Sequence, residues 1–363
     1  MLSSRAMSLM VAASLFGVLF LSACDSGGDN SSFVTTGVYV ANQGNFSDAN
    51  GSITVYDPVG KTSQQLVADA GSTVQSIMLS GDIIYMMSNT GGRIDVYDRS
   101  SGSQVDQIDG LASPRYMAVS DVQIGYVTNL FKTGFTGGSV SVVDLVSGSV
   151  TSTVDVGDNP EGVAISGGQV FVANSAFGEG TTLSTISLSN NLVTGTIDVG
   201  CDGPRLLFGD REDELWVVCT GKTVFDANSN IVEQTDGEIV ILDGPTGAVV
   251  TRIPIAGQVS TVGPGQDAFY SEGAQELYVV VDSERILRFN TGSNGLAENL
   301  GVFAGDEIGA VAYDSRSKQI YVARVPSFTA AGYVTVHDRS GQQLEQFPTG
   351  IAPSHIAFAV EEQ

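Results

Sequence analysis

One short phrase recurs seven times along this chain of 363 residues, and no other feature limits the possible fold as strongly. Each copy sets an aromatic residue among apolar and β-branched neighbours, which is the composition of a β-strand. The aromatic residues are 46, 41, 45, 45, 62 and 43 positions apart, and they are Tyr39, Tyr85, Tyr126, Phe171, Trp216, Tyr278 and Tyr321. The chain is therefore predicted to be a row of similar β units.

Three further strand patterns accompany each copy. In the third and fourth repeats they are the alternating phrase Gly138–Asp144, the run Val150–Val156 and the Pro-led phrase Pro160–Ile165. Four short strands per repeat of this length are typical of a β-propeller blade. The sequence predicts an all-β, seven-bladed β-propeller of four-stranded antiparallel blades over residues 33–363. A β-helix or solenoid is the alternative, but its repeats are shorter.

The order of the patterns also predicts how the ring closes. We name the four strands of a unit A (Pro-led), B (aromatic), C and D. The array opens on the B strand around Tyr39 and ends on an A strand, His355–Val360. The C-terminal strand should therefore complete the first blade and remove a free sheet edge.

The repeats resemble the YVTN-repeat propellers of bacterial and archaeal surface proteins. Tyr126–Asn129 spells that signature, and Asn159–Ile165 and Gly138–Asp144 match its other two segments. The resemblance covers about residues 33–360 and is weakest in the fifth and sixth repeats, where Cys219 and Val281 replace the Asn. It implies a surface-exposed propeller; some similar lipoproteins capture corrinoids for outer-membrane transporters.

The N-terminus predicts export. Residues 1–23 contain one charge, Arg5, and the apolar run Leu9–Leu21, as in a signal peptide. The run ends in Leu-Ser-Ala-Cys24, which resembles the bacterial lipobox, so we expect lipidation at Cys24 and membrane anchoring; a plain secretory signal is the alternative. Residues 24–32 form a polar, Gly/Ser-rich tether. The outer membrane or cell surface is favoured, and the periplasmic face of the inner membrane stays open.

The charge balance narrows the possible partners. With 16 Lys+Arg against 40 Asp+Glu, the net charge is −24, so nucleic acid is not expected. Two His and three Cys leave few ligands for a transition metal, and we expect no cofactor and a monomer. Calcium ligation by Asp202, Asp306 and Glu307 stays open. The acidity fits either a salt-adapted organism or an ordinary acidic secreted protein.

The long loops indicate the working face of the ring. B–C and D–A connections share one face and are longer than those on the other. These loops contain six phenylalanines in polar, Gly-rich sequence: Phe46, Phe131, Phe135, Phe177, Phe225 and Phe328. Either each ring pins its own loop, or several line a shared ligand platform. Phe131, Phe135 and Phe177 are the candidates for that platform.

Strand A lines the central channel, and its second residue should lie at the channel mouth. Arg115, Glu161 and Arg205 occupy this position in consecutive blades. They could form an ion-pair network that joins blades, or a polar anchor for an anionic or amide-bearing ligand. His355 should lie beside them, as a candidate ligand residue or a hydrogen-bonded structural one.

Two cysteines should meet on the long-loop face. Cys201 lies in a D–A loop, and Cys219 ends the B strand that returns from it. We expect a disulfide in an oxidising compartment; two buried thiols are the alternative.

No Gly-x-Ser-x-Gly, His-Glu-x-x-His or Cys-x-x-Cys motif is present. The expected function is therefore a non-enzymatic module that captures a small molecule or a protein at the long-loop face. The alternative is a channel-mouth enzyme, such as a lactonase-like hydrolase.

Overall fold

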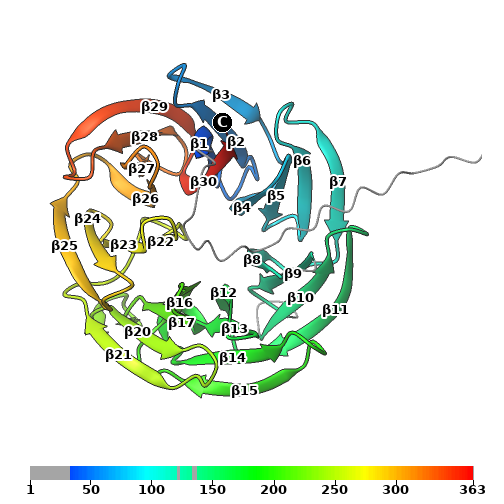
Figure 1. The fold of residues 1–363 in the computed structure, drawn as a ribbon, viewed down its shortest axis with the longest axis vertical. Helices are drawn as coiled ribbons and strands as arrows, with labels where there is room; N and C mark the ends of the chain where they lie inside the picture. Colours follow the sequence, from blue (N-terminus) through cyan, green and yellow to red (C-terminus); the bar gives the residue numbers. More distant parts are fainter. Residues whose placement is uncertain (1–32, 121–122, 133–136, 363) are drawn as a thin grey trace, which may run out of the picture.

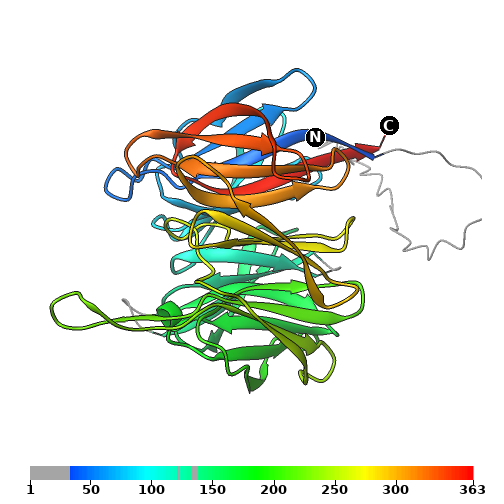
Figure 2. The same ribbon diagram turned by 90° about the vertical axis from the view of Figure 1, so that its left-hand side faces the viewer.

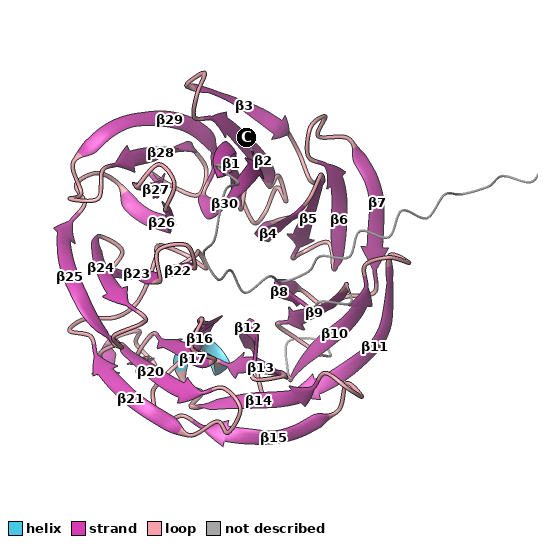
Figure 3. Cartoon of the chain, in the orientation of Figure 1, coloured by secondary structure: helices cyan, strands magenta, loops and turns pink. Residues whose placement is uncertain are grey.

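The computed structural model describes residues 33–120, 123–132 and 137–362, and these form a ring of seven four-stranded antiparallel sheets (Figure 1). The predicted seven-bladed propeller is confirmed. The regular secondary structure is almost entirely strand, and the one helix among the described residues is the short 3-10 turn η1, Ala176–Gly178 (Figure 3). The predicted signal peptide, Cys24, the tether and Phe135 lie outside the described residues.

The first four blades follow the repeat boundaries. Blade 1 holds β1 (Phe33–Asn42), β2 (Ser52–Asp57), β3 (Thr62–Val67) and β30 (Pro353–Glu362). Blade 2 holds β4 (Val74–Ser80), β5 (Ile83–Ser88), β6 (Arg93–Asp98) and β7 (Gln104–Asp109). Blade 3 holds β8 (Pro114–Val119), β9 (Ile124–Asn129), β10 (Gly138–Asp144) and β11 (Ser149–Val156). Blade 4 holds β12 (Pro160–Ser166), β13 (Gln169–Asn174), β14 (Thr182–Ser187) and β15 (Val193–Asp198).

The last three blades complete the ring. Blade 5 holds β16 (Pro204–Gly209), β17 (Glu214–Cys219), β20 (Glu238–Asp243) and β21 (Val249–Pro254). Blade 6 holds β22 (Ala268–Ser271), β23 (Glu276–Val281), β24 (Arg285–Asn290) and β25 (Gly295–Val302). Blade 7 holds β26 (Glu307–Asp314), β27 (Gln319–Val325), β28 (Ala331–His337) and β29 (Gln343–Ile351).

Ring closure follows the predicted scheme. β30 is the innermost strand of blade 1 and pairs antiparallel with β1, with Ala41 opposite His355 and Val40 opposite Ile356. The two ends of the chain therefore stabilise one sheet together. Since the backbone donors and acceptors of β1 face β30 rather than water, β1 leaves no unpaired edge towards the channel.

Burial follows the order of the strands within a blade. The B strands are buried along most of their length, as the 2% exposure of Tyr126 and the 1% exposure of Trp216 illustrate, whereas the outer D strand β11 is largely exposed. The core lies between blades: Tyr126 and Val140 of blade 3 pack with Val163 and Val172 of blade 4. Packing of neighbouring blades, rather than one central core, therefore stabilises the ring.

The Asn that ends the B strands of blades 3 and 4 fastens two other segments. Asn129 Nδ2 donates to Ser139 Oγ at 3.1 Å and Ser141 Oγ at 2.9 Å, both on strand C. Asn129 Oδ1 accepts the Ala112 backbone N–H of the preceding D–A loop at 3.1 Å. The recurrent Asn therefore holds the long-loop end of a blade together, because it satisfies buried polar groups on both sides.

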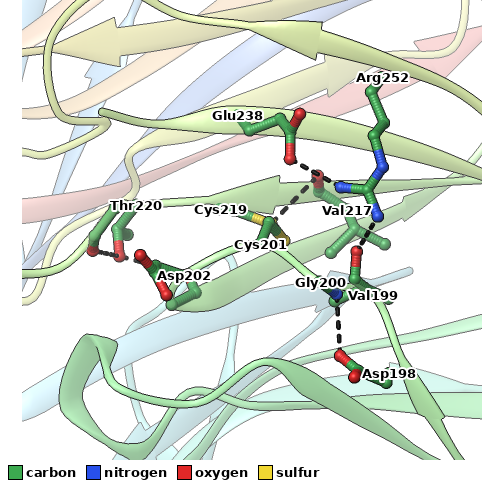
Figure 4. The surroundings of a disulfide bond; sticks show 12 residues. Asp198, Val199, Gly200, Cys201, Asp202, Val217, Cys219, Thr220, Glu238 and Arg252 are labelled. Atoms are coloured by element: carbon green, nitrogen blue, oxygen red, sulfur yellow. Dashed lines mark hydrogen bonds and ion pairs between the residues drawn. A yellow bond between two sulfur atoms is a disulfide. The ribbon is translucent and has the colours of Figure 1, made fainter. Parts of the chain in front are cut away.

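Two blades fasten the same loop differently. In blade 5 a disulfide joins Cys219 to Cys201 of the D–A loop, with Cα atoms 6.2 Å apart (Figure 4). In blade 7 Arg324 donates to the Asp306 and Ala304 carbonyl oxygens at 2.9 and 3.3 Å. Blades 3, 5 and 7 thus hold the D–A loop to the end of the B strand by three different bonds: amide hydrogen bonds, a disulfide and arginine hydrogen bonds.

The long fifth repeat carries an insertion. β18 (Thr223–Phe225) and β19 (Ile231–Gln234) form a hairpin that projects from one face of the ring, whereas β1 begins and β30 ends on the opposite side (Figure 2). No helix in the described ranges is long and apolar enough to cross a bilayer.

Candidate functional site at the channel mouth

The long-loop face contains a cavity of about 830 Å³ at the mouth of the central channel. Its floor is polar and comes from the starts of the A strands, where Gln75, Arg115, Glu161 and Arg205 reach it from blades 2 to 5. Its rim is aromatic and comes from the loops: Phe46, Phe131, Phe177 and Phe225. Cavities of roughly 300–1,000 Å³ with a few convergent polar groups are the usual binding sites for small molecules.

One half of the floor is a hydrogen-bonded chain across three blades. Arg115 Nε donates to Glu161 Oε2 at 2.9 Å, and Arg115 Nη2 donates to Glu161 Oε1 at 2.7 Å. Arg115 Nη1 also donates to Gln75 Oε1. Side-chain exposures of 6% for Arg115 and 10% for Glu161 show that this bidentate pair is desolvated. Water screens it little, so it holds its geometry firmly.

The other half of the floor is centred on Arg205. Arg205 Nη1 lies 2.6 Å from Asp267 Oδ2 as an ion pair, although the angle is not that of a hydrogen bond. Arg205 Nη2 donates to the Gly265 carbonyl oxygen at 3.3 Å. Gly265 is required here, because a Cβ would lie 1.9 Å from the Gly309 oxygen. Among the described residues, buried Arg205 Nε has no hydrogen-bond acceptor.

The charges of the floor depend on burial and on each other. Desolvation opposes the charge of Arg205, but the Asp267 and Glu161 carboxylates outweigh it and raise the pKa of this guanidinium. Burial raises the pKa of Asp267, while Arg205 and two hydrogen bonds from Thr261 act against the rise. Arg205 therefore stays cationic under all ordinary conditions and presents a fixed positive charge to the cavity.

The aromatic rim decides between the two roles predicted for the loop phenylalanines. Phe46 is 74% exposed and Phe177 is 71% exposed, so neither ring packs enough on its own loop to pin it. Phe131 and Phe177 tilt towards one another, with ring centroids 6.4 Å apart. Phe225 completes the rim from the inserted hairpin. The arrangement favours the shared platform, because exposed rings that face one cavity can bury area against a ligand.

Backbone strain accompanies the Phe177 ring. Ala176 and Phe177 are consecutive residues with left-handed φ angles of 44° and 56°, a conformation that non-glycine residues rarely adopt. Such strain costs of order 1–3 kcal/mol per residue and concentrates at ligand-binding segments. The turn η1 therefore holds Phe177 at the cavity against the local backbone preference.

His355 lies deeper than expected. It lines a second cavity, of about 150 Å³, inside the channel, together with Ser76, Tyr116 and Gln266. Its Nδ1 is buried and has no hydrogen-bond partner among the described residues. Burial lowers the pKa of His355 to about 4, so the imidazole is neutral at pH 7. His355 therefore lies below the mouth cavity and is not one of its lining residues.

The structure brings most of the predicted site residues together and separates others from them. Arg115, Glu161, Arg205, Phe131 and Phe177 share the mouth cavity. Arg205, however, pairs with Asp267 rather than completing a network of three. Asp267 was missed because the sequence comparison considered only the second residue of each A strand, and Asp267 precedes β22.

The three candidate calcium ligands are not brought together. Asp202 accepts a hydrogen bond from Thr235 at 2.8 Å, and Asp306 accepts one from Tyr333 at 3.0 Å. Glu307 begins β26 and is exposed. In the ranges that the structure describes, no group of three or more His, Cys, Asp or Glu side chains is placed to hold a metal ion.

No family model and no curated protein sequence matches this chain. Among solved structures, it is similar to the periplasmic gluconolactonase PpgL of Pseudomonas aeruginosa, with 16% identity, a TM-score of 0.66, and 89% of this chain and 99% of that chain covered. It is also similar to a candidate 6-phosphogluconolactonase from Bacteroides fragilis NCTC 9343, with 13% identity, a TM-score of 0.62, and coverages of 89% and 98%. At these identities the likeness is one of fold.

These neighbours correct one expectation. The absence of the familiar catalytic motifs favoured a non-enzymatic module. That expectation is wrong: propellers of the same architecture include the periplasmic gluconolactonase, an enzyme. The propeller fold is thus compatible with catalysis, since function depends on the site rather than on the fold.

Proposed function

We propose that this protein is a hydrolase that opens a lactone at the mouth of its propeller channel. The observation that carries the proposal is the cavity floor, where the Glu161 carboxylate lies among the buried Arg115 and the partly buried, cationic Arg205. Lactone hydrolysis needs a base for water and positive charge for the oxyanion, and this floor offers both. The gluconolactonase fold neighbour supports the choice of reaction.

Arg205 is the residue for the carbonyl oxygen. Its guanidinium stays charged, and its side chain is 14% exposed at the cavity. Its Nη groups are turned to Asp267 and Gly265, which fix its position before substrate arrives. A preorganised cation in a water-poor site stabilises developing negative charge more than a mobile one would.

Glu161 is the residue for the water. Arg115 engages one lone pair on each of the two carboxylate oxygens and orients the group. Each oxygen keeps a second lone pair, which can accept a proton from water. Arg115 is then a positioning residue, because it acts through Glu161.

The reaction balances with water alone. The water oxygen bonds to the lactone carbonyl carbon, one water proton passes to Glu161, and the carbonyl π electrons move to the oxygen beside Arg205. The tetrahedral intermediate then breaks its ring C–O bond, and the departing oxygen takes the proton back from Glu161. As that bond breaks, the oxyanion electrons re-form the C=O bond, so the product is a hydroxy acid beside Arg205. The second proton of the water leaves the new carboxyl group for solvent, which yields the carboxylate and the acid that is measured.

We also propose that the protein is an exported, monomeric lipoprotein related to the YVTN-repeat propellers, with Cys24 as the lipidated residue. β1 begins on the side of the ring opposite the β18–β19 hairpin (Figure 2). A tether that precedes Phe33 would therefore hold the channel mouth away from the membrane, towards dissolved substrate. The outer membrane or cell surface remains the favoured location.

The activity is tested with purified residues 33–363 and a panel of lactones, with acid release followed in a pH-stat. We expect turnover of at least one lactone and competitive inhibition by its hydroxy-acid product. Arg205→Gln should lower kcat by about 100-fold or more, as the loss of an oxyanion donor does. The variant Arg211→Gln, which changes a half-exposed arginine in an A–B connection, is the control and should keep full activity. Release of acid at the uncatalysed rate for every lactone would overturn the proposal.

A further inference from the structure

We infer that the substrate is a lactone whose ring carries an apolar substituent, either an alkyl chain of several carbons or an aromatic group. This inference rests on the proposed lactone hydrolysis and adds the substrate class. The chemistry of the floor needs only the lactone ring. The rest of the cavity, at about 830 Å³, has room for much more than one ring.

The rim shows what fills that room. Four phenylalanines border the cavity, from loops of blades 1, 3 and 4 and from the hairpin of blade 5: Phe46, Phe131, Phe177 and Phe225. Their exposure to water is unfavourable in the free protein and is relieved when an apolar group covers them. A ligand with hydroxyl groups alone would leave that apolar area without a partner.

The rim is also built at a cost to the backbone. Ala176 and Phe177 both have left-handed φ angles, and the η1 turn gains no buried apolar side chain in return, because Phe177 is 71% exposed. The turn therefore holds an exposed apolar ring beside the cavity, where a ligand can cover it. Phe131, tilted against Phe177 across a blade boundary, makes the second wall of the same apolar subsite.

The position of the subsite sets the geometry of the substrate. Phe131 and Phe177 follow the B strands of blades 3 and 4, and Arg115 and Glu161 begin the A strands of the same two blades. A lactone ring at Glu161 therefore directs its substituent outwards between Phe131 and Phe177. The substituent should be on the ring carbon next to the ring oxygen or on the carbon next to the carbonyl, since both lie at the edge of the reacting group.

The test compares kcat/KM for δ-valerolactone, glucono-δ-lactone and δ-decalactone, which share a six-membered ring and differ in the substituent. We expect δ-decalactone to exceed the other two by about tenfold or more. Phe131→Ala and Phe177→Ala should each reduce this preference about five- to tenfold. Phe33→Ala is the matched control: this ring is 55% exposed and lies at the far end of β1 from the mouth, so the preference should not change.

The outcomes separate the inference from the proposal on which it rests. Equal or better turnover of glucono-δ-lactone, with no effect of the two Phe variants on the ratio, would overturn the apolar substrate class and leave lactone hydrolysis standing. Failure to hydrolyse any of the three, or any other lactone, would overturn both. A preference that falls equally in Phe33→Ala would show that the rim does not determine it, and would also contradict the inference.

Discussion

Arg115 holds both carboxylate oxygens of Glu161 across the boundary between blades 3 and 4, through contacts of 2.9 and 2.7 Å. Side-chain exposures of 6% and 10% place this contact out of water. A buried pair of this kind stabilises a fold only while both partners are present, because a lone buried charge is strongly unfavourable. The same contact thus joins two blades and orients the proposed base.

Removal of one partner should therefore cost more than removal of both. We expect Arg115→Met to lower the free energy of unfolding by about 3–5 kcal/mol. Arg115→Met/Glu161→Leu should recover a large part of that loss, because no unpaired charge remains in the interface. Urea unfolding of the two variants beside wild type measures the difference. A double variant less stable than Arg115→Met would contradict this account of the pair.

A substitution that relieves backbone strain in the η1 turn should stabilise the protein. Ala176→Gly should raise the free energy of unfolding by about 1 kcal/mol, since glycine adopts a φ of 44° without the steric cost that alanine bears. Thermal unfolding checks the gain. Gly81, which already has a φ of 54° in an A–B turn, supplies the reverse control: Gly81→Ala should lower stability by a similar amount. A loss of stability in Ala176→Gly would mean that the turn is not strained.

The partly buried His355, whose Nδ1 is shielded from water, predicts a specific dependence of stability on pH. Its pKa in the folded protein is about 4, below the 6.5 of an exposed imidazole. The unfolded chain therefore binds the extra proton first, and the stability due to neutral His355 is full above pH 6.5 and is lost as pH falls towards 4. The loss amounts to roughly 2–3 kcal/mol.

The measurement compares wild type with His355→Gln, so that the other titrating groups cancel. The free energy of unfolding of wild type, relative to that of His355→Gln, should fall by roughly 2–3 kcal/mol between pH 7 and pH 4. A difference that stays constant over this range would show that His355 titrates in the folded state as it does in water.

The disulfide should contribute to stability in one blade only. Cys201→Ser/Cys219→Ser frees the D–A loop of blade 5 and should cost about 3 kcal/mol, as expected for a bridge that closes a loop of 18 residues. Cys219→Asn/Cys201→Ser should not restore it. The Asn clamps need Ser or Thr partners such as Ser139 and Ser141, whereas β20 offers Glu238 and Val240. Full recovery with Asn, measured by chemical unfolding, would contradict this explanation.

Repetition explains why the fold was accessible from sequence. Seven spaced copies of one strand pattern predict seven equal units, and the position of His355–Val360 after the last full unit predicts the closure of blade 1. Even the variable end of the B strand has a physical reason, because Asn129, Cys219 and Arg324 each fasten a D–A loop by a different bond. Local patterns and the global arrangement agree throughout.

Only part of the candidate site could be predicted from the sequence, because only some of its residues occupy equivalent positions in the repeats. Arg115, Glu161 and Arg205 occupy equivalent positions in the repeat, so alignment brings them to one place. Asp267 does not occupy the second position of an A strand, because it lies in the loop before β22. Its carboxylate reaches Arg205 from that loop. The depth of His355 is shown by its neighbours in the inner cavity, such as Ser76 and Tyr116 from other blades, which a linear pattern does not contain. Pairing partners and depth arise from the three-dimensional ring rather than from any one repeat.

The most direct test of the account is the effect of Glu161→Gln on turnover of a lactone substrate at saturation. The amide oxygen can accept one of the two Arg115 hydrogen bonds, but the amide cannot accept the proton of the attacking water, so kcat should fall by about 100-fold or more while KM changes little. Glu272→Gln, at an exposed site in an A–B connection, should leave both constants unchanged. An unchanged kcat in folded Glu161→Gln would contradict the central claim that the channel mouth, with Glu161 as its base, is the catalytic site.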